Sequence, residues 1–126
     1  MLNVLLEFPD DILAVEWQGE VTAEDYRNVL VPAALDKIRQ HGHLRRLAVL
    51  GPSFETITAG AMWEDAKLGF GHLSNFSRVG VVTDIAWIRD SVRLFAPLFR
   101  NPVRVFSNAD RVAAEAWIVS RDGVTD

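Results

Sequence analysis

The chain has 126 residues, of which 49% are hydrophobic, and we expect a single domain over residues 1–126. It holds no cysteine, which excludes disulfides, thiolate metal sites and cysteine nucleophiles. The formal net charge of −4 argues against nucleic acid as a partner, because a dedicated nucleic-acid binder carries a strongly basic face. No apolar run approaches the roughly 20 residues that span a bilayer, and the first residues lack the basic region of a secretory signal. We therefore expect a cytoplasmic protein.

The first elements in chain order are two short strands. Apolar-rich runs at 3–8 and 12–18 are separated by residues 9–11, Pro-Asp-Asp, and these residue types favour turns. The pattern predicts an antiparallel hairpin. A further strand is expected at 44–50, ending before Gly-Pro.

A long helix is predicted between the hairpin and that strand. Thr22 followed by Asp25 is close to a capping box, so the helix is expected to begin at Ala23 and to run to about Gln40. Pro32 lies inside the helix, where it removes an N–H donor and predicts a kink. Gly42 is expected to end the helix in a left-handed conformation.

Helices and strands alternate in the second half of the chain. We expect helices at about 58–72, 85–99 and 109–120, with strands at 79–82 and 103–106. The expected buried face of the first helix consists of Ala59, Met62, Trp63, Ala66, Phe70 and Leu73. That of the last helix consists of Val112, Ala113, Ala116 and Trp117.

The element order is therefore β-β-α-β-α-β-α-β-α. Strands that alternate with helices favour parallel pairing, with the helices packed over the sheet. The sequence predicts a single-domain α/β fold with a mostly parallel five-stranded sheet, an antiparallel N-terminal edge and covering helices.

Three segments carry a resemblance to a known family. They are Val-Thr-Ala-Glu-Asp-Tyr at 21–26, Met-Trp-Glu-Asp-Ala-Lys at 62–67 and Val-Val-Thr-Asp at 81–84. Together with the element order, they resemble the SpoIIAA-like family of the STAS superfamily, the fold of bacterial anti-sigma-factor antagonists and of the cytoplasmic domains of sulfate transporters. The resemblance covers about 3–120. It implies a four- to five-stranded sheet, a small non-enzymatic cytosolic protein, and kinship with the CRAL-TRIO type of lipid-carrier fold.

The resemblance also implies where a regulatory phosphate would lie. STAS antagonists are switched by phosphorylation of a serine at the start of the helix after the third strand, typically in Asp-Ser-Ser/Ala-Gly. The matching loop, 51–58, offers Ser53, Thr56 and Thr58 as weak phosphosite candidates. It lacks the Asp-Ser pair, and Glu55 would repel a phosphate. Since a turn role explains Ser53 and an N-cap role explains Thr58, we expect no phosphoserine switch.

No catalytic, cofactor-binding or metal-binding residues are predicted. Glu64 and Lys67 form an i, i+3 pair on a helix surface, Asp65 points elsewhere around that helix, and Trp63 is expected to pack against the core. The His-Gly-His segment at 41–43 lacks the further ligands that zinc requires. No Ser-His-Asp order, phosphate-binding glycine loop or close carboxylate pair stands out.

The helix at 85–99 has more apolar surface than one sheet face requires. Its apolar arc spans roughly 200°, against about 100° for a single core-facing stripe. The inner part consists of Ile85, Ile88, Val92, Phe95 and Phe99, and a second stripe consists of Trp87, Leu94 and Leu98. Arg89, Arg93 and Arg100 flank this second stripe. Either neighbouring helices cover it, or it meets a second subunit, an apolar ligand or a membrane surface.

These patterns support two functional hypotheses. The first is a non-enzymatic STAS-like binding or regulatory module whose partner is another protein, a second copy in a homodimer, or a small apolar ligand. The alternative is a peripheral membrane or lipid-carrier protein that uses helix 85–99. The candidate apolar contact or ligand surface comprises Trp87, Leu94, Leu98, Trp63 and Phe70. A ligand site predicts an apolar cavity beneath helices 58–72 and 85–99, whereas membrane binding predicts an exposed stripe rimmed by arginine.

Overall fold

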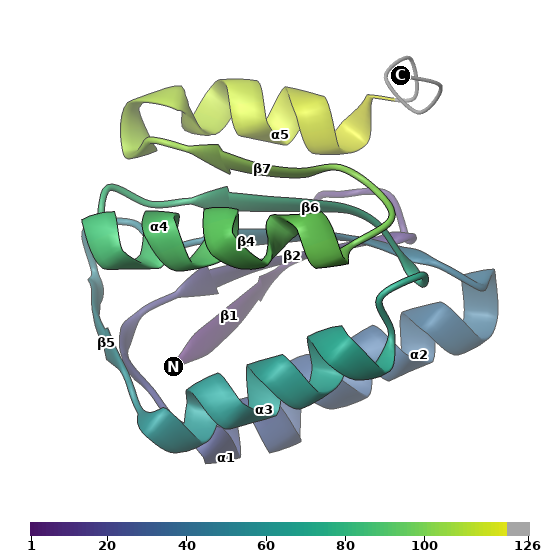
Figure 1. Cartoon of the computed structure of the whole chain (residues 1–126), viewed down its shortest axis with the longest axis horizontal. Helices are drawn as coiled ribbons and strands as arrows, with labels where there is room; N and C mark the ends of the chain where they lie inside the picture. The colour runs from purple at the N-terminus through teal and green to yellow at the C-terminus, as the bar shows by residue number, and fades with distance from the viewer. Residues whose placement is uncertain (121–126) are drawn as a thin grey trace.

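Five strands form the central sheet of the computed structural model, which describes residues 1–120 (Figure 1). The strands are β1 (Leu2–Leu5), β2 (Ile12–Trp17), β4 (Leu44–Val49), β6 (Phe76–Val82) and β7 (Val103–Phe106), in the order β1-β2-β4-β6-β7. β1 pairs antiparallel with β2, and the other three pairs are parallel. This arrangement confirms the predicted mostly parallel sheet with an antiparallel N-terminal edge.

Helices cover both faces of the sheet (Figure 1). On one face lie α2 (Val31–His41), α3 (Ala59–Gly71) and α4 (Ala86–Phe95), and on the other lies α5 (Arg111–Val119). Side chains alternate between the faces, as the strand period of two requires: Leu13 and Val15 join the core under α2, while Ala14 joins the core under α5. No helix within residues 1–120 is long and apolar enough to cross a membrane.

The predicted long first helix is interrupted by a widened turn. It begins with α1 (Ala23–Asp25), where Thr22 and Asp25 form the expected capping box. A π-helical turn follows over Tyr26–Leu30 before α2. Pro32 lacks an N–H, and its ring would clash with the carbonyl four residues earlier, so the chain widens just before the proline. Gly42 ends α2 with a left-handed φ of 76°, as predicted.

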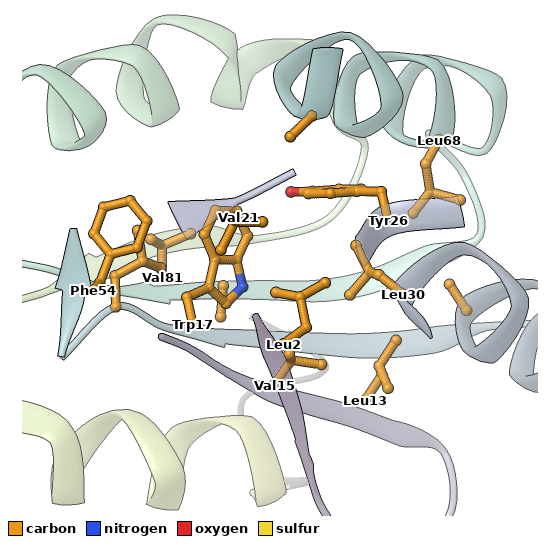
Figure 2. Close-up of a cluster of buried hydrophobic side chains, with 14 of the residues drawn as sticks. Leu2, Leu13, Val15, Trp17, Val21, Tyr26, Leu30, Phe54, Leu68 and Val81 are labelled. Atoms are coloured by element: carbon orange, nitrogen blue, oxygen red, sulfur yellow. The ribbon is translucent and has the colours of Figure 1, made fainter. Parts of the chain in front are cut away.

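A second, two-stranded sheet was not anticipated. β3 (Gly19–Val21) pairs in parallel with β5 (Phe54–Ile57), so part of the segment expected to be a loop at 51–58 is a strand. These strands are too short to show periodicity. Phe54 is nevertheless buried and packs edge-on against Trp17, with ring centroids 5.9 Å apart. Figure 2 shows Trp17 between Phe54 on one side and Tyr26 on the other.

The predicted inner faces of two helices are wrong. In α3 the buried residues are Ala61 and Leu68, whereas Met62, Trp63 and Phe70 are exposed. In α5 Ala114 and Ile118 are buried, and Val112 is exposed. For α3 the reason is that it packs on α1 as well as over the sheet. A Cβ on Gly60 would lie 3.2 Å from that of Ala23, so small residues face α1 and large ones face outward.

Candidate apolar binding pocket

A pocket of about 320 Å³ lies between α3 and α4 above the sheet. The sheet forms its floor, through Ala48 of β4, Leu50 just after β4, and Val79 and Val81 of β6. The two helices form its walls. These are lined by Met62, Ala66 and Phe70 of α3 and by Trp87, Ile88, Val92 and Phe95 of α4. The size falls at the lower end of the ~300–1,000 Å³ range of small-molecule sites. Because Met62, Phe70, Trp87 and Phe95 are also exposed, the apolar lining continues to the protein surface.

Aromatic side chains join the two helices at one end of the pocket. Phe70 of α3 meets Phe95 of α4 edge-to-face, with ring centroids 6.0 Å apart. Phe99 lies 3.6 Å from where a Cβ on Gly69 would be, so the glycine admits the ring. Phe99 in turn meets Phe76 of the sheet edge-to-face at 6.1 Å. These rings hold α3 and α4 apart over the sheet.

One polar cluster, formed by Arg46, Asp65 and Tyr26, lies in the pocket wall. Nη1 of Arg46 lies 2.7 Å from Oδ1 of Asp65, and the Tyr26 hydroxyl donates to the same oxygen at 3.1 Å. Burial and the Asp65 charge raise the pKa of Tyr26 well above its ordinary value. Burial is the largest influence on the pKa of Arg46 and lowers it, but Asp65 and Tyr26 together outweigh burial and keep the net shift upward. At neutral pH Arg46 is therefore a guanidinium and Tyr26 a neutral phenol.

Sequence reasoning missed this cluster, although one signal was present. Arg45 and Arg46 occupy adjacent positions of a strand that is covered on both faces. Buried arginines require partners, and successive residues of a strand point to opposite faces. The pattern thus indicated one charged site on each side of the sheet. The identity of the partners depends on tertiary packing, because Asp65 lies on α3.

The other sequence-predicted site residues fall into two groups. Trp87 and Phe70 line the pocket, as expected for a ligand surface. Leu94, Leu98 and Trp63 are exposed and lie outside the lining. Of the three flanking arginines, Arg89 donates to the Thr83 carbonyl at 2.8 Å, whereas Arg93 and Arg100 are exposed.

Comparisons with known proteins identify the family. A model of the SpoIIAA-like family matches residues 12–119. The chain belongs to the SpoIIAA-like family. Among solved structures, it is similar to an uncharacterised protein of the DUF3478 family with a SpoIIAA-like fold from Shewanella loihica PV-4. The TM-score is 0.66 at 23% identity over 94% of this chain and 92% of that one. No curated protein matches. These findings confirm the SpoIIAA-like fold.

We predict that this SpoIIAA-like protein is not switched by phosphorylation of the loop at 51–58. Ser53 and Thr56 are exposed, but Glu55 lies between them. The Thr58 hydroxyl accepts from the Ala61 N–H at 3.1 Å, so it already serves as the N-cap of α3. Phosphopeptide mass spectrometry of protein from its own host should find no stoichiometric phosphate here. Such a phosphate, together with altered partner binding, would contradict the prediction.

The histidine pair of this SpoIIAA-like protein is engaged with carboxylates. His41 Nε2 lies 2.7 Å from Oδ2 of Asp10, and His43 Nε2 lies 3.2 Å from Oδ2 of Asp11. The hydrogen bond from His41, with the nearby Lys37 charge, lowers the pKa of Asp10. Within residues 1–120, no group of three His, Cys, Asp or Glu side chains could hold a metal ion.

The opposite face of the sheet carries a second buried arginine site. Nη2 of Arg45 lies 3.1 Å from both carboxylate oxygens of Asp11, and Nη1 donates to the Ile118 carbonyl at 2.7 Å. Arg78 donates to the carbonyls of Trp117 and Ser120. Carbonyls at a helix C-terminus lack intrahelical partners, and the negative end of the helix dipole favours cations there. These arginines therefore anchor the end of α5, a structural role.

Proposed function

We propose that this SpoIIAA-like protein is a non-enzymatic, cytoplasmic binding module that takes a small, mainly apolar molecule between α3 and α4. The observation that carries the proposal is the pocket itself, whose lining is apolar apart from a few side chains gathered mainly in one cluster. Small-molecule sites have this composition: apolar walls supply affinity, and a few polar groups fix orientation.

The exposed part of the pocket lining also supports binding of an apolar molecule. Met62, Phe70, Trp87 and Phe95 present large apolar surfaces to water at the pocket. Burying apolar surface is favourable by about 25 cal/mol per Å². A ligand that covers these side chains would remove that surface from water without requiring a new cavity in the core.

Filling the pocket from its floor should abolish binding while the fold survives. Ala48 is buried on β4 and lines the pocket, so Ala48→Leu places a larger side chain in the ligand's space. We expect native mass spectrometry of protein purified from its own host to show a bound small molecule in the wild type and none in Ala48→Leu. Because cavity filling commonly adds about 0.5–2 kcal/mol of stability, the variant should unfold no earlier than the wild type.

The matched control is Ala113→Leu, which makes the same change on the exposed surface of α5. It should keep the bound molecule. Binding that survives Ala48→Leu, or that is lost equally in both variants, would contradict the assignment of this pocket. A wild type that carries no ligand and takes up none would contradict the function.

A second candidate function is self-association through Trp87, Leu94 and Leu98. Leu94 is 73% exposed and Leu98 is 51% exposed, so neighbouring helices do not cover this stripe. We favour a second copy of the chain over a bilayer. The net charge of −4 opposes approach to an anionic leaflet, and each arginine near such a surface contributes only about 1 kcal/mol.

The double substitution Leu94→Ser and Leu98→Ser tests this contact. Surface substitutions usually change stability by no more than about 0.5 kcal/mol each, so the variant should remain folded. Its self-association in analytical sedimentation should weaken. Weaker liposome binding with unchanged sedimentation would favour the membrane alternative. A folded variant unchanged in both assays would contradict both forms of contact.

A further inference from the structure

Arg46 has more hydrogen-bond donors than the surrounding protein satisfies. The residue is only 9% exposed and lines the apolar pocket. Within residues 1–120, the side-chain groups engaging its guanidinium are one Asp65 carboxylate oxygen and the Tyr26 hydroxyl. A guanidinium carries five N–H donors in a planar fork, so two acceptors leave part of the fork unpaired. Within residues 1–120 no Arg46 nitrogen is both buried and without a partner. The open N–H groups are therefore accessible from the pocket, where an acceptor on a ligand can pair with them.

A second donor, the indole N–H of Trp17, is buried beside the pocket and lies toward Leu2 (Figure 2). Trp17 is 6% exposed, lines the pocket, and has an indole N–H with no acceptor among residues 1–120. It packs edge-on against Tyr26, with ring centroids 5.9 Å apart (Figure 2). Because Arg46 lines the pocket and its guanidinium offers donors only, a complementary ligand brings hydrogen-bond acceptors.

We propose that the ligand is an amphiphilic monocarboxylate whose carboxylate binds Arg46 and whose hydrocarbon part lies between α3 and α4. The inference rests on the proposed function and assigns its ligand class. A planar guanidinium fork matches the two oxygens of a carboxylate. Arg46 is the only cationic side chain that lines the pocket within the described residues, so the site suits a single negative charge better than a phosphate dianion.

Asp65 occupies the place that the ligand carboxylate would take. One of its oxygens lies 2.7 Å from Arg46, yet its side chain is 40% exposed. It can therefore turn toward solvent as the ligand enters, without burying its charge. Asp65 then acts as a competitor for Arg46: it keeps the guanidinium paired in the unliganded protein and weakens ligand binding. This role predicts that changes at Arg46 and at Asp65 act in opposite directions.

Comparing the binding of decanoate with that of 1-decanol distinguishes the contribution of the ligand's carboxylate from that of its hydrocarbon part. Both are titrated below their solubility limits, with the fluorescence of the pocket tryptophans Trp17 and Trp87 as the readout. Arg46→Gln should weaken decanoate binding by about tenfold or more, as expected for loss of a charge-assisted hydrogen bond. Asp65→Asn should strengthen decanoate binding, and neither change should alter decanol binding. Arg46→Lys keeps the charge without the fork and should give an intermediate loss.

The possible results distinguish a failure of the carboxylate assignment from a failure of the proposed function on which it rests. If decanol binds as well as decanoate, and the Arg46 and Asp65 variants change neither affinity, the headgroup assignment is wrong while the apolar pocket stands. If neither compound binds the wild type, the proposed function fails as well. If decyl phosphate binds more tightly than decanoate, the monocarboxylate class is overturned. Should Arg46→Gln not fold, the gain of affinity in Asp65→Asn remains decisive, because asparagine keeps an oxygen for Tyr26.

Discussion

Replacement of Asp11 by alanine is expected to destabilise the fold by about 3–5 kcal/mol, the typical cost of leaving one partner of a buried ion pair uncompensated. The side chain of Asp11 is 10% exposed and that of Arg45 is 4% exposed. Without Asp11, the acceptors left to the guanidinium within residues 1–120 are the carbonyls at the end of α5, which do not neutralise its charge.

Chemical denaturation of matched variants would measure this effect. Asp10→Ala is the control, because Asp10 is the neighbouring residue and its carboxylate lies on the surface. It should leave the unfolding midpoint nearly unchanged. Asp11→Asn keeps an acceptor for Arg45 and should fall between the two. Equal midpoints for Asp10→Ala and Asp11→Ala would contradict the claim that the Asp11–Arg45 pair anchors α5.

The same variant separates structure from binding. Arg45 and Arg46 are adjacent on β4, but Arg45 faces α5 and Arg46 faces the pocket. Asp11→Ala should therefore lower the folded fraction without changing ligand affinity per folded molecule. The two buried arginines thus serve different purposes on the two faces of one strand.

Local patterns predicted most of the architecture. The hairpin, the five-stranded sheet, the capping box at Thr22 and the stop at Gly42 all follow from residue types at fixed spacings, and the structure confirms them. The proline at position 32 predicted a kink, and the chain forms a π-helical turn just before it. These features depend on a few neighbouring residues, which the sequence shows directly.

Features set by distant contacts could not be predicted. The pairing of β3 with β5 joins segments more than thirty residues apart, and neither strand is long enough to show a period. The partnership of Arg46 with Asp65 depends on where α3 crosses the sheet. The sequence predicted an apolar cavity beneath two named helices if a ligand is bound, and a pocket lies there. The polar cluster in its wall became visible only once α3 was placed.

The orientation of α3 leads to the second large expected effect, a contrast between Leu68 and Phe70. Helical spacing pointed to Phe70 as a core residue, yet Phe70 is 49% exposed and Leu68 is 4% exposed. Leu68→Ala should lower the free energy of unfolding by about 2–5 kcal/mol, because it opens a cavity in the core. Phe70→Ala should cost about 1 kcal/mol, the value of an aromatic pair such as that with Phe95.

Ligand binding should show the opposite order, since Phe70 lines the pocket and Leu68 does not. Denaturation curves, which measure stability, and decanoate titrations, which measure affinity, therefore give two independent tests of the orientation of α3. Phe70→Ala should stay folded and bind more weakly, because it removes apolar surface from the pocket wall. Leu68→Ala, where it remains folded, should bind nearly as the wild type does. A larger loss of stability in Phe70→Ala than in Leu68→Ala would mean that α3 presents the other face to the core, and the pocket between α3 and α4 would then lose one of its walls.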